Sequence, residues 1–324
     1  MRRFTHFNAF TVEEAASILK RYGSRARVIA GGTDLLGKMK DEILPAYPEA
    51  IVNLKTIPGL DFIEEKERLL KIGALTRLGD IANDEKVRRR YTALAESTRR
   101  VASPNIREMG TLGGNLCQDI RCWFYRCPNN RFPCLRKGGG RCYAIEGENR
   151  YHSIFGGSVE QGCYAVHPSD VAPALIAMNG SIVTSKRTID AEEFFQVGVT
   201  RTTVLEDDEI VTEIHVPAPA ENTRSAFIKF ALRKSIDFPI VNCAVMVTLS
   251  GQKVCAARVC LNAVFVRPYR ARKAEETLIG EPLHEAGADA AGRAAVSEAK
   301  PLRHNQYMVQ IAKTMVKRAI LACR

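Results

Sequence analysis

A cysteine-rich segment over residues 117–163 constrains the fold of this 324-residue chain more than any other feature. The segment has no helical or strand-like hydrophobic period, and it is interrupted by Gly138–Gly140 and Gly156–Gly157. A loop of this length inside a compact domain needs a local source of order, and a bound metal would supply it. Six of the ten cysteines lie within these 47 residues, namely Cys117, Cys122, Cys127, Cys134, Cys142 and Cys163.

The spacing of these cysteines does not identify the metal. The C-x2-C pairs of structural zinc sites are absent, and so is the C-x2-C-x2-C run of bacterial ferredoxins. Arginines in the same segment favour depressed thiol pKa values, which would help the cysteines to bind a soft metal. The pattern therefore favours an iron–sulfur cluster, with a zinc site and free or redox-active thiols as alternatives.

Length and composition indicate two domains and no membrane span. A chain of 324 residues exceeds one ordinary core, and no run of eighteen apolar residues occurs. The N-terminus lacks the apolar core of a signal peptide, so we expect a cytoplasmic protein. The net charge of +11 suits a solvated basic surface or an acidic partner. No nucleic-acid-binding motif accompanies it, so neither nucleic acid nor membrane is an expected partner.

Hydrophobic periodicity predicts a mixture of helices and strands before residue 217. Thr11 and Glu14 form a capping box that starts a helix, and Gly23 ends it. Residues 78–98 also have the apolar spacing of a helix.

The C-terminal part follows a linker at residues 217–219. Three strand-like runs are spaced there as an antiparallel meander, over residues 225–232, 241–249 and 254–266. A final helix has an apolar stripe, and we expect this stripe to pack against the meander. The stripe consists of Met308, Ile311, Met315, Ala319 and Cys323.

Two glycine pairs suggest a site for a diphosphate. Gly31-Gly32 directly follows a short apolar strand, and Gly113-Gly114 lies 82 residues later. Because glycine has no Cβ, backbone N–H groups in such turns can approach a diphosphate closely. The G-x-G-x-x-G pattern is absent, so an ordinary NAD-binding fold is not supported. Taken singly, a glycine pair is usually only a turn.

Three segments, in order, resemble motifs of the flavin subunits of the xanthine oxidase family. They are VIAGGTDLL at residues 28–36, ASPNIREMGTLGGN at residues 102–115, and PSDVAP at residues 168–173. The tail from residue 222 resembles the C-terminal domain of these subunits. In the family the last two motifs are separated by a few residues, whereas here the cysteine segment lies between them.

This resemblance implies that the first two motifs surround the diphosphate of FAD and that Asp170 lies near its adenosine or ribitol part. Gln118 follows the second motif closely. Lys186 and Lys229 lie where the family places a basic or polar group near the flavin. The residues expected to bind FAD are Ile29, Ala30, Gly31, Gly32, Thr33, Asp34, Leu35, Leu36, Thr111, Gly114, Asn115, Gln118, Asp170, Lys186 and Lys229.

A cysteine loop at this position resembles the insertion that holds a [4Fe–4S] cluster in the 4-hydroxybenzoyl-CoA reductase branch of the family. Flavin subunits of some molybdenum aldehyde oxidoreductases have a similar insertion. Cys127 is the first reserve ligand, and Cys117 is expected to be a packing residue. The ligands that the resemblance implies are Cys122, Cys134, Cys142 and Cys163.

The implied fold is α+β. It has a two-lobed, PCMH-like FAD-binding domain at residues 1–219, with a [4Fe–4S]-bearing loop at about residues 117–165. Residues 220–324 would form a three-stranded antiparallel sheet with helices. The implied partners are a large subunit with a molybdenum cofactor and a small subunit with [2Fe–2S] clusters, assembled as a dimer of heterotrimers. This subunit would carry electrons and perform no substrate chemistry itself.

Three functions follow from these observations. In 4-hydroxybenzoyl-CoA reductase, the primary hypothesis, electrons from a low-potential ferredoxin would pass from [4Fe–4S] to FAD, then to [2Fe–2S] and molybdenum, where the phenolic hydroxyl is removed. In a molybdenum aldehyde oxidoreductase, the second hypothesis, electrons would flow outward to an acceptor. The third belongs to another class, a zinc-stabilised binding protein whose glycine pairs are only turns.

Overall fold

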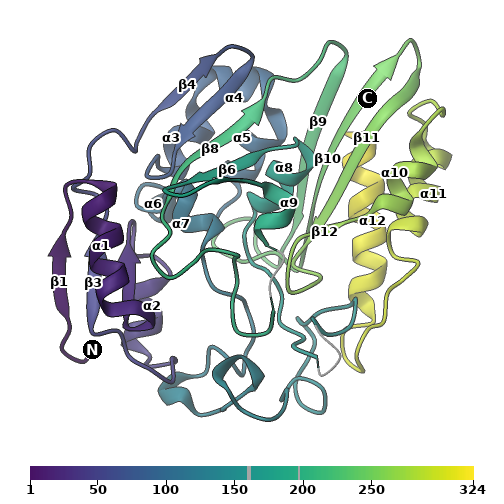
Figure 1. Ribbon diagram of the computed structural model, residues 1–324. Coiled ribbons are helices and arrows are strands. Elements are labelled where there is room, and N and C mark those ends of the chain that lie inside the picture. Colours follow the sequence, from purple (N-terminus) through teal and green to yellow (C-terminus); the bar gives the residue numbers. More distant parts are fainter. Residues whose placement is uncertain (159–161, 196–197) are drawn as a thin grey trace.

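The computed structural model describes residues 1–158, 162–195 and 198–324. It contains a three-stranded, a five-stranded and a four-stranded β-sheet with helices packed around them, so the predicted α+β class is confirmed. Figure 1 shows the N-terminal lobe in purple, the C-terminal helices in yellow, and the cysteine loop (residues 117–165) in teal along the lower edge. None of the helices in the described residues is long and apolar enough to cross a membrane.

The N-terminal lobe is a parallel sheet with strand order β1-β3-β2. The helix predicted from the capping box is present, since the Thr11 hydroxyl accepts a hydrogen bond from the Glu14 N–H at 3.1 Å. Strand β2 leads directly into the first glycine pair. The elements are β1 (Thr5–Asn8), α1 (Val12–Tyr22), η1 (Gly23–Arg25), β2 (Ala26–Ile29), α2 (Leu35–Lys40) and β3 (Ala50–Asn53).

The central lobe is an antiparallel sheet with strand order β4-β5-β8-β6-β7. Its strands are β4 (Ile63–Lys66), β5 (Leu69–Gly73), β6 (Ser181–Thr184), β7 (Thr188–Asp190) and β8 (Val211–Pro217). Its helices are α3 (Leu78–Asn83), α4 (Glu85–Arg90), α5 (Thr92–Arg99), α6 (Pro104–Arg107), α7 (Leu112–Leu116), α8 (Ala172–Ala177) and α9 (Ala191–Phe194). The helical segment predicted at residues 78–98 is divided into three helices, because Asp84 caps α4 and Tyr91 has a non-helical backbone.

The C-terminal lobe is an antiparallel sheet with strand order β12-β11-β10-β9. The three predicted strands are present, but the predicted count is wrong by one. The two-residue β12 pairs only with Cys260 and Leu261, and it is too short to show an alternating pattern. The elements are β9 (Thr223–Phe230), β10 (Val241–Ser250), β11 (Lys253–Asn262), β12 (Tyr269–Arg270), α10 (Arg272–Leu278), α11 (Glu285–Ala295) and α12 (Tyr307–Leu321).

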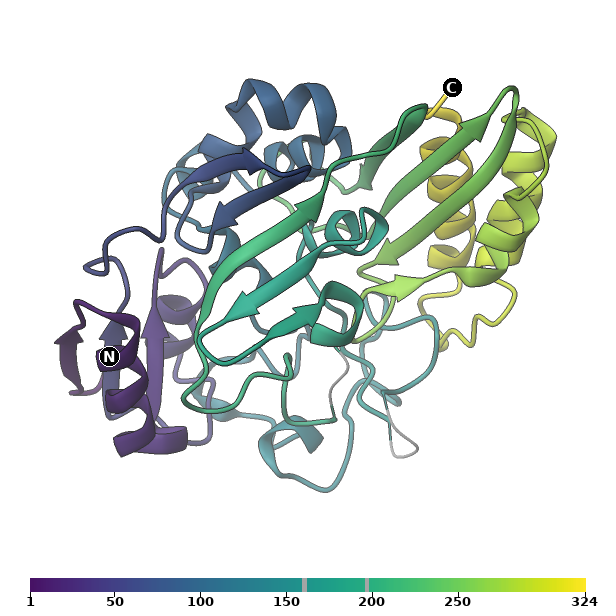
Figure 2. The ribbon, with the colours of Figure 1, turned by 45° about the horizontal axis from the view of Figure 1, so that its top comes forward.

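The apolar stripe of α12 packs against this sheet, as predicted. Met308, Met315 and Ala319 are buried in the same cluster as Val245 of β10 and Leu261 of β11. Figure 2 shows α12 lying along one face of the sheet. The stripe is therefore core packing rather than part of a cofactor site.

The cysteine loop is almost without regular structure. It contains only two short 3₁₀ turns in its described residues, η2 (Pro128–Asn130) and η3 (Leu135–Lys137). Residues 159–161 of the predicted insertion lie outside the described residues. Backbone hydrogen bonds between Arg121 and Val166, at 2.9 and 3.0 Å, close the root of the loop. Ile120, Tyr125 and Ala165 of the loop form a small core with Ile43 and Val266 from outside it, so apolar packing orders part of the loop.

Candidate cofactor site

The two glycine pairs belong to loops that touch each other. A Cβ added to Gly31 would lie 2.0 Å from the backbone oxygen of Met109, so only glycine permits this approach. The two loops also meet at Gly110, where an added Cβ would lie at an ordinary contact distance, 3.8 Å, from the Thr33 hydroxyl oxygen. Segments about eighty residues apart in the sequence therefore form one wall of a single site.

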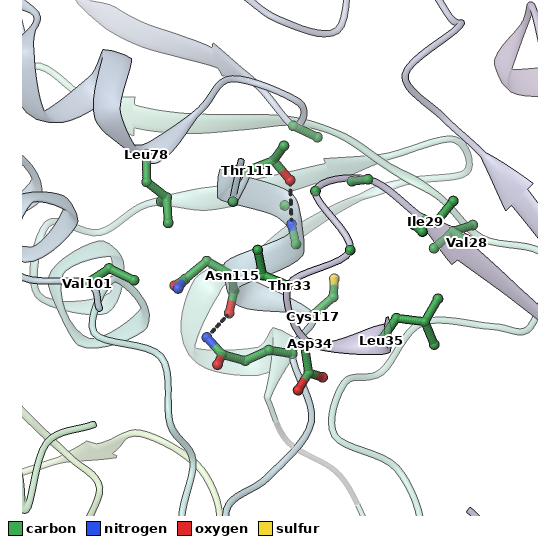
Figure 3. Close-up of a pocket in the computed structure, with 18 of the residues that line it drawn as sticks. Val28, Ile29, Thr33, Asp34, Leu35, Leu78, Val101, Thr111, Asn115 and Cys117 are labelled. Carbon is green, nitrogen blue, oxygen red and sulfur yellow. Dashed lines mark hydrogen bonds between the residues drawn. The ribbon is translucent and has the colours of Figure 1, made fainter. Parts of the chain in front are cut away.

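A cavity of about 450 Å³ opens beside these loops, within the range of known cofactor pockets. Figure 3 shows part of its lining. Twelve of the fifteen residues predicted to bind FAD line it, namely Ile29, Ala30, Gly31, Gly32, Thr33, Asp34, Leu35, Thr111, Gly114, Asn115, Gln118 and Asp170. The apolar part of the wall includes Val28 and Ile106 of the first two motifs. It also includes four residues to which the sequence had not pointed, namely Leu78, Val101, Ile210 and Ile236.

The second glycine pair begins helix α7 on the cavity wall. The Thr111 hydroxyl caps the helix by accepting a hydrogen bond from the Gly114 N–H at 3.2 Å, and Figure 3 draws this bond. The Asn115 side chain is buried, and its oxygen accepts a hydrogen bond from the Ser169 hydroxyl at 2.5 Å. The second and third motifs are thus joined directly, although the cysteine loop separates them in the sequence.

Asp170 lies where the central and C-terminal lobes meet. Its buried carboxylate accepts hydrogen bonds from Lys229 Nζ at 2.6 Å and from Asn242 Nδ2 at 2.7 Å. Lys229 does not line the cavity, but this pair places it directly behind Asp170. A buried ion pair of this kind fixes the carboxylate rather than leaving it free to move.

Two further predicted FAD residues also lie outside the cavity lining. Lys186 is turned to the surface, where its Nζ forms ion pairs with Glu206 at 2.7 Å and with Asp208 at 2.6 Å. Leu36 is partly exposed and packs over Gly32. Lys186 lies in the turn between β6 and β7 and Leu36 lies in α2, and the roles of both residues at the flavin remain predictions.

His167 is a completely buried neighbour of the third motif. Its Nδ1 lies 3.2 Å from the Asn262 amide nitrogen, and burial lowers the pKa of the imidazole to about 3. Because the folded-state pKa lies below the unfolded value, the stability that the neutral ring provides is complete above about pH 6.5 and is lost as the pH falls toward 3.

Replacing His167 by glutamine is therefore expected to weaken the acid sensitivity of the fold. The wild-type free energy of unfolding should fall by on the order of 4 kcal/mol between pH 6.5 and 3 through this residue alone. Urea unfolding at a series of pH values measures this slope. The His6→Gln variant, at an exposed position, serves as control. An equal slope in the His167→Gln variant and the wild type would contradict this assignment.

Asp34 of the first motif binds the cysteine loop. Its carboxylate pairs with Arg126 Nη1 at 2.6 Å and accepts a hydrogen bond from the Asp119 N–H at 3.0 Å. Burial alone would raise the pKa of the Asp34 carboxyl, but the charges of Arg126 and Lys38 outweigh burial and hold this pKa below its usual value. The carboxylate therefore anchors the glycine loop to the cysteine loop.

Asp119 is the second carboxylate of this network. It accepts hydrogen bonds from the Tyr125 hydroxyl at 2.5 Å and the Thr202 hydroxyl at 3.0 Å, and it lies 3.3 Å from Lys38 Nζ. Burial opposes its charge, but the neighbouring cations, Lys38 first among them, hold its pKa below the usual range. We name Asp34, Lys38, Asp119 and Arg126 the anchor network. Of these four residues, only Asp34 belongs to the predicted FAD site, because no local sequence pattern distinguishes the other three from ordinary surface charges.

The four cysteines proposed as ligands line one small cavity. Its volume is about 10 Å³, and its wall includes Cys122, Cys134, Cys142 and Cys163 together with Arg136 and several apolar side chains. Cys127 does not line this cavity, and Cys117 lines the larger one. In residues 1–158, 162–195 and 198–324, no group of three or more His, Cys, Asp or Glu side chains is arranged to hold a metal ion.

The expected depression of the thiol pKa values is wrong. Burial raises the pKa of the Cys122 thiol to about 12, and it also raises the pKa values of Cys134 and Cys163. Most arginines of the loop are used elsewhere, since Arg121 covers the Phe238 ring and Arg126 pairs with Asp34. Desolvation of these three free thiols therefore outweighs the nearby positive charges and favours the protonated form.

Comparison with known proteins supports this geometry. Residues 2–219 match the family described as the FAD binding domain in molybdopterin dehydrogenase, and residues 226–323 match the CO dehydrogenase flavoprotein C-terminal domain. The chain belongs to the FAD-binding subunits of the molybdenum hydroxylase family. Members of this family are oxidoreductase subunits, and FAD binding is the property that they share.

Individual relatives in this family cover the whole chain. The aldehyde oxidoreductase FAD-binding subunit PaoB of Escherichia coli K12 is 31% identical over all of this chain and 99% of its own length. The carbon monoxide dehydrogenase medium chain of Hydrogenophaga pseudoflava is 30% identical over 99% of this chain and 96% of its own. A solved structure of the latter enzyme superposes with a TM-score of 0.78 at 29% identity, over 99% of this chain and 97% of that chain.

Proposed function

We propose that this chain binds FAD between the two glycine loops and serves as the electron-transfer subunit of a molybdenum enzyme. The contact of Gly31 with Met109 is the observation that carries the proposal, because it joins two FAD motifs around one cavity. The backbone of these loops can approach a diphosphate, and Val28, Leu78 and Val101 can pack against the cofactor. When bound, FAD supplies one- and two-electron chemistry.

We further propose that Cys122, Cys134, Cys142 and Cys163 hold a [4Fe–4S] cluster. Support comes from their convergence on one cavity and from the scarcity of regular structure in the described residues of the loop. Four thiolates are the ligand set that such a cluster requires.

The holoenzyme that we propose first is an aldehyde oxidoreductase, which was the second of the sequence-based hypotheses. The full-length similarity to the E. coli aldehyde oxidoreductase subunit favours it. Electrons would then leave through FAD, and the partners would be a molybdenum-cofactor large subunit and a [2Fe–2S] small subunit. 4-Hydroxybenzoyl-CoA reductase, with a ferredoxin donor, is the second candidate, supported by the cysteine loop alone. The family assignment does not favour a zinc-stabilised binding protein.

Assays of the intact complex distinguish the two enzymes. The complex would be purified through a tag on this chain and supplied either with aldehydes and an electron acceptor or with 4-hydroxybenzoyl-CoA and a low-potential donor. We expect aldehyde-dependent reduction of the acceptor. Reductive dehydroxylation without aldehyde oxidation would favour the second candidate, and absence of flavin from the complex would refute both.

Replacing a proposed cluster ligand is expected to remove iron but not flavin. The Cys134→Ser variant should lose most of the iron–sulfur absorbance and electron paramagnetic resonance signal, because serine is a poor ligand for this cluster. Iron and flavin would be quantified per chain in the purified complex. The Cys255→Ser variant is the matched control, since Cys255 is exposed on β11, far outside the loop in sequence. Full iron content in the Cys134→Ser variant would exclude Cys134 as a ligand.

A further inference from the structure

Arg136 is a buried cation at the cysteine cavity. It follows Cys134 by two residues in η3, and its side chain is only 2% exposed. It lines the cavity that the four cysteines share. Its Nη2 donates a hydrogen bond to the Thr202 hydroxyl at 3.1 Å, and the Asp119 carboxylate is 3.9 Å away.

Two nitrogens of this guanidinium, Nε and Nη1, have no hydrogen-bond partner within the described part of the chain. A guanidinium stays charged at all ordinary pH values and presents five N–H donors. Burial of such a group with donors unused is unfavourable, so proteins normally place an anion or an acceptor beside it. Asp119 fills this role poorly, because Lys38, Tyr125 and Thr202 already surround its carboxylate.

The surrounding charges leave an excess of positive charge. Lys137 adds to it, since its Nζ also lacks a hydrogen-bond partner in the described residues and lies 5.3 Å from the Tyr125 ring. Two carboxylates, Asp34 and Asp119, thus lie among four cations, which are Lys38, Arg126, Arg136 and Lys137. A negatively charged group in the cysteine cavity would balance this excess.

We propose that Arg136 is the counter-charge of the [4Fe–4S] cluster and that its Nε–H and Nη1–H donate hydrogen bonds to the sulfur atoms there. This inference rests on the proposed function, because four thiolates give such a cluster a net negative charge. Reduction adds one further negative charge, which the guanidinium stabilises without transferring a proton. Arg136 therefore acts as a positioning residue that raises the reduction potential of the cluster.

Redox titration of the purified holoenzyme, followed by electron paramagnetic resonance, tests this role. Removing a unit charge from the wall of a buried site should change the ratio of reduced to oxidised cluster by about tenfold or more, or about 59 mV for a one-electron couple. We expect the midpoint potential of the cluster to be about 59 mV more negative in the Arg136→Gln variant than in the wild type. The Arg136→Lys variant should shift less, because it keeps the charge but loses the planar arrangement of donors.

The Arg141→Gln variant is the matched control, because Arg141 is an exposed cation of the same loop that stacks on Tyr143. Its midpoint potential should equal that of the wild type. A wild-type midpoint potential in an iron-replete Arg136→Gln variant would overturn the proposal. If that variant loses its iron, the Arg136→Lys variant decides. A midpoint potential lowered by about 59 mV or more in this variant, which keeps the positive charge, would overturn the proposal. A wild-type holoenzyme without iron–sulfur signal would instead refute the proposed cluster itself.

Discussion

Replacing Gly31 by alanine is expected to abolish FAD binding and to destabilise the contact between the two glycine loops. The added methyl group would lie 2.0 Å from the backbone oxygen of Met109, and a backbone atom cannot rotate out of the way. The loops must separate, at a cost of about 3 kcal/mol or more in the free energy of unfolding. Flavin absorbance per chain and urea unfolding measure the two effects.

The Gly37→Ala variant is the control for this prediction. Gly37 lies in α2, six residues further along, and a Cβ there would meet nothing within 4 Å. Alanine in a helix is favoured over glycine by about 1 kcal/mol, so this variant should be as stable as the wild type or slightly more stable. Full flavin content in the Gly31→Ala variant would show that the loops separate without affecting the site.

Replacing Arg126 by methionine is expected to weaken both the fold and the FAD site. Arg126 pairs with Asp34 at 2.6 Å, and its Nη2 donates a hydrogen bond to the Asp119 carbonyl oxygen at 2.6 Å. Without Arg126, Lys38 at 3.5 Å is the remaining ion-pair partner of the partly buried Asp34 carboxylate among the described residues. Removal of one partner from a buried ion pair costs about 3–5 kcal/mol, and we expect the lower end of this range.

Loss of FAD affinity should accompany this loss of stability, because Asp34 lies two residues after Gly31-Gly32 and holds that loop in place. Fluorescence titration with FAD and urea unfolding measure the two quantities. The Arg131→Met variant removes an exposed cation from the same loop. It should change neither the free energy of FAD binding nor the free energy of unfolding by more than about 0.5 kcal/mol. Equal FAD affinity in the Arg126→Met variant and the wild type would show that the anchor network does not support the site.

The anchor network also has a defined response to acid. The pKa values of Asp34 and Asp119 lie below their usual values, so their contribution to stability is complete above about pH 4 and is lost as the pH falls further. The same change in pH protonates His167, but the His167 contribution begins to decline near pH 6.5. The two effects can therefore be separated by the pH at which each begins.

Local sequence was sufficient for the elements that depend on local interactions. The capping box of Thr11 and Glu14 predicted the start of α1, and alternation predicted β9, β10 and β11. The same reasoning missed β12, whose two residues are too few to show a period. It also treated residues 78–98 as one helical segment, because apolar spacing continues across the breaks. The Asp84 side chain caps α4 by accepting a hydrogen bond from the Val87 N–H, and Tyr91 has a non-helical backbone.

The cysteine loop illustrates how tertiary structure overrides composition. Its many arginines suggested low thiol pKa values, but burial raises the pKa values of Cys122, Cys134 and Cys163 and outweighs the nearby cations. The choice of four ligands among six cysteines, and the domain limits at residues 117–165 and 219, remain predictions. Cys122, Cys134, Cys142 and Cys163 line one cavity, and for this reason the substitution experiment targets one of these four cysteines.

The order and spacing of the FAD motifs were fixed by the sequence itself, because backbone access at a diphosphate requires glycine at particular positions. Only the tertiary structure decided what those motifs contact. It brings Gly31 against Met109 and turns the Asp34 carboxylate toward Arg126 of the cysteine loop. Such contacts join residues about eighty and ninety positions apart, and chain folding rather than local preference determines which distant groups meet. The anchor network, and the two guanidinium nitrogens of Arg136 that lack a partner in the described residues, are visible for this reason only in the folded chain.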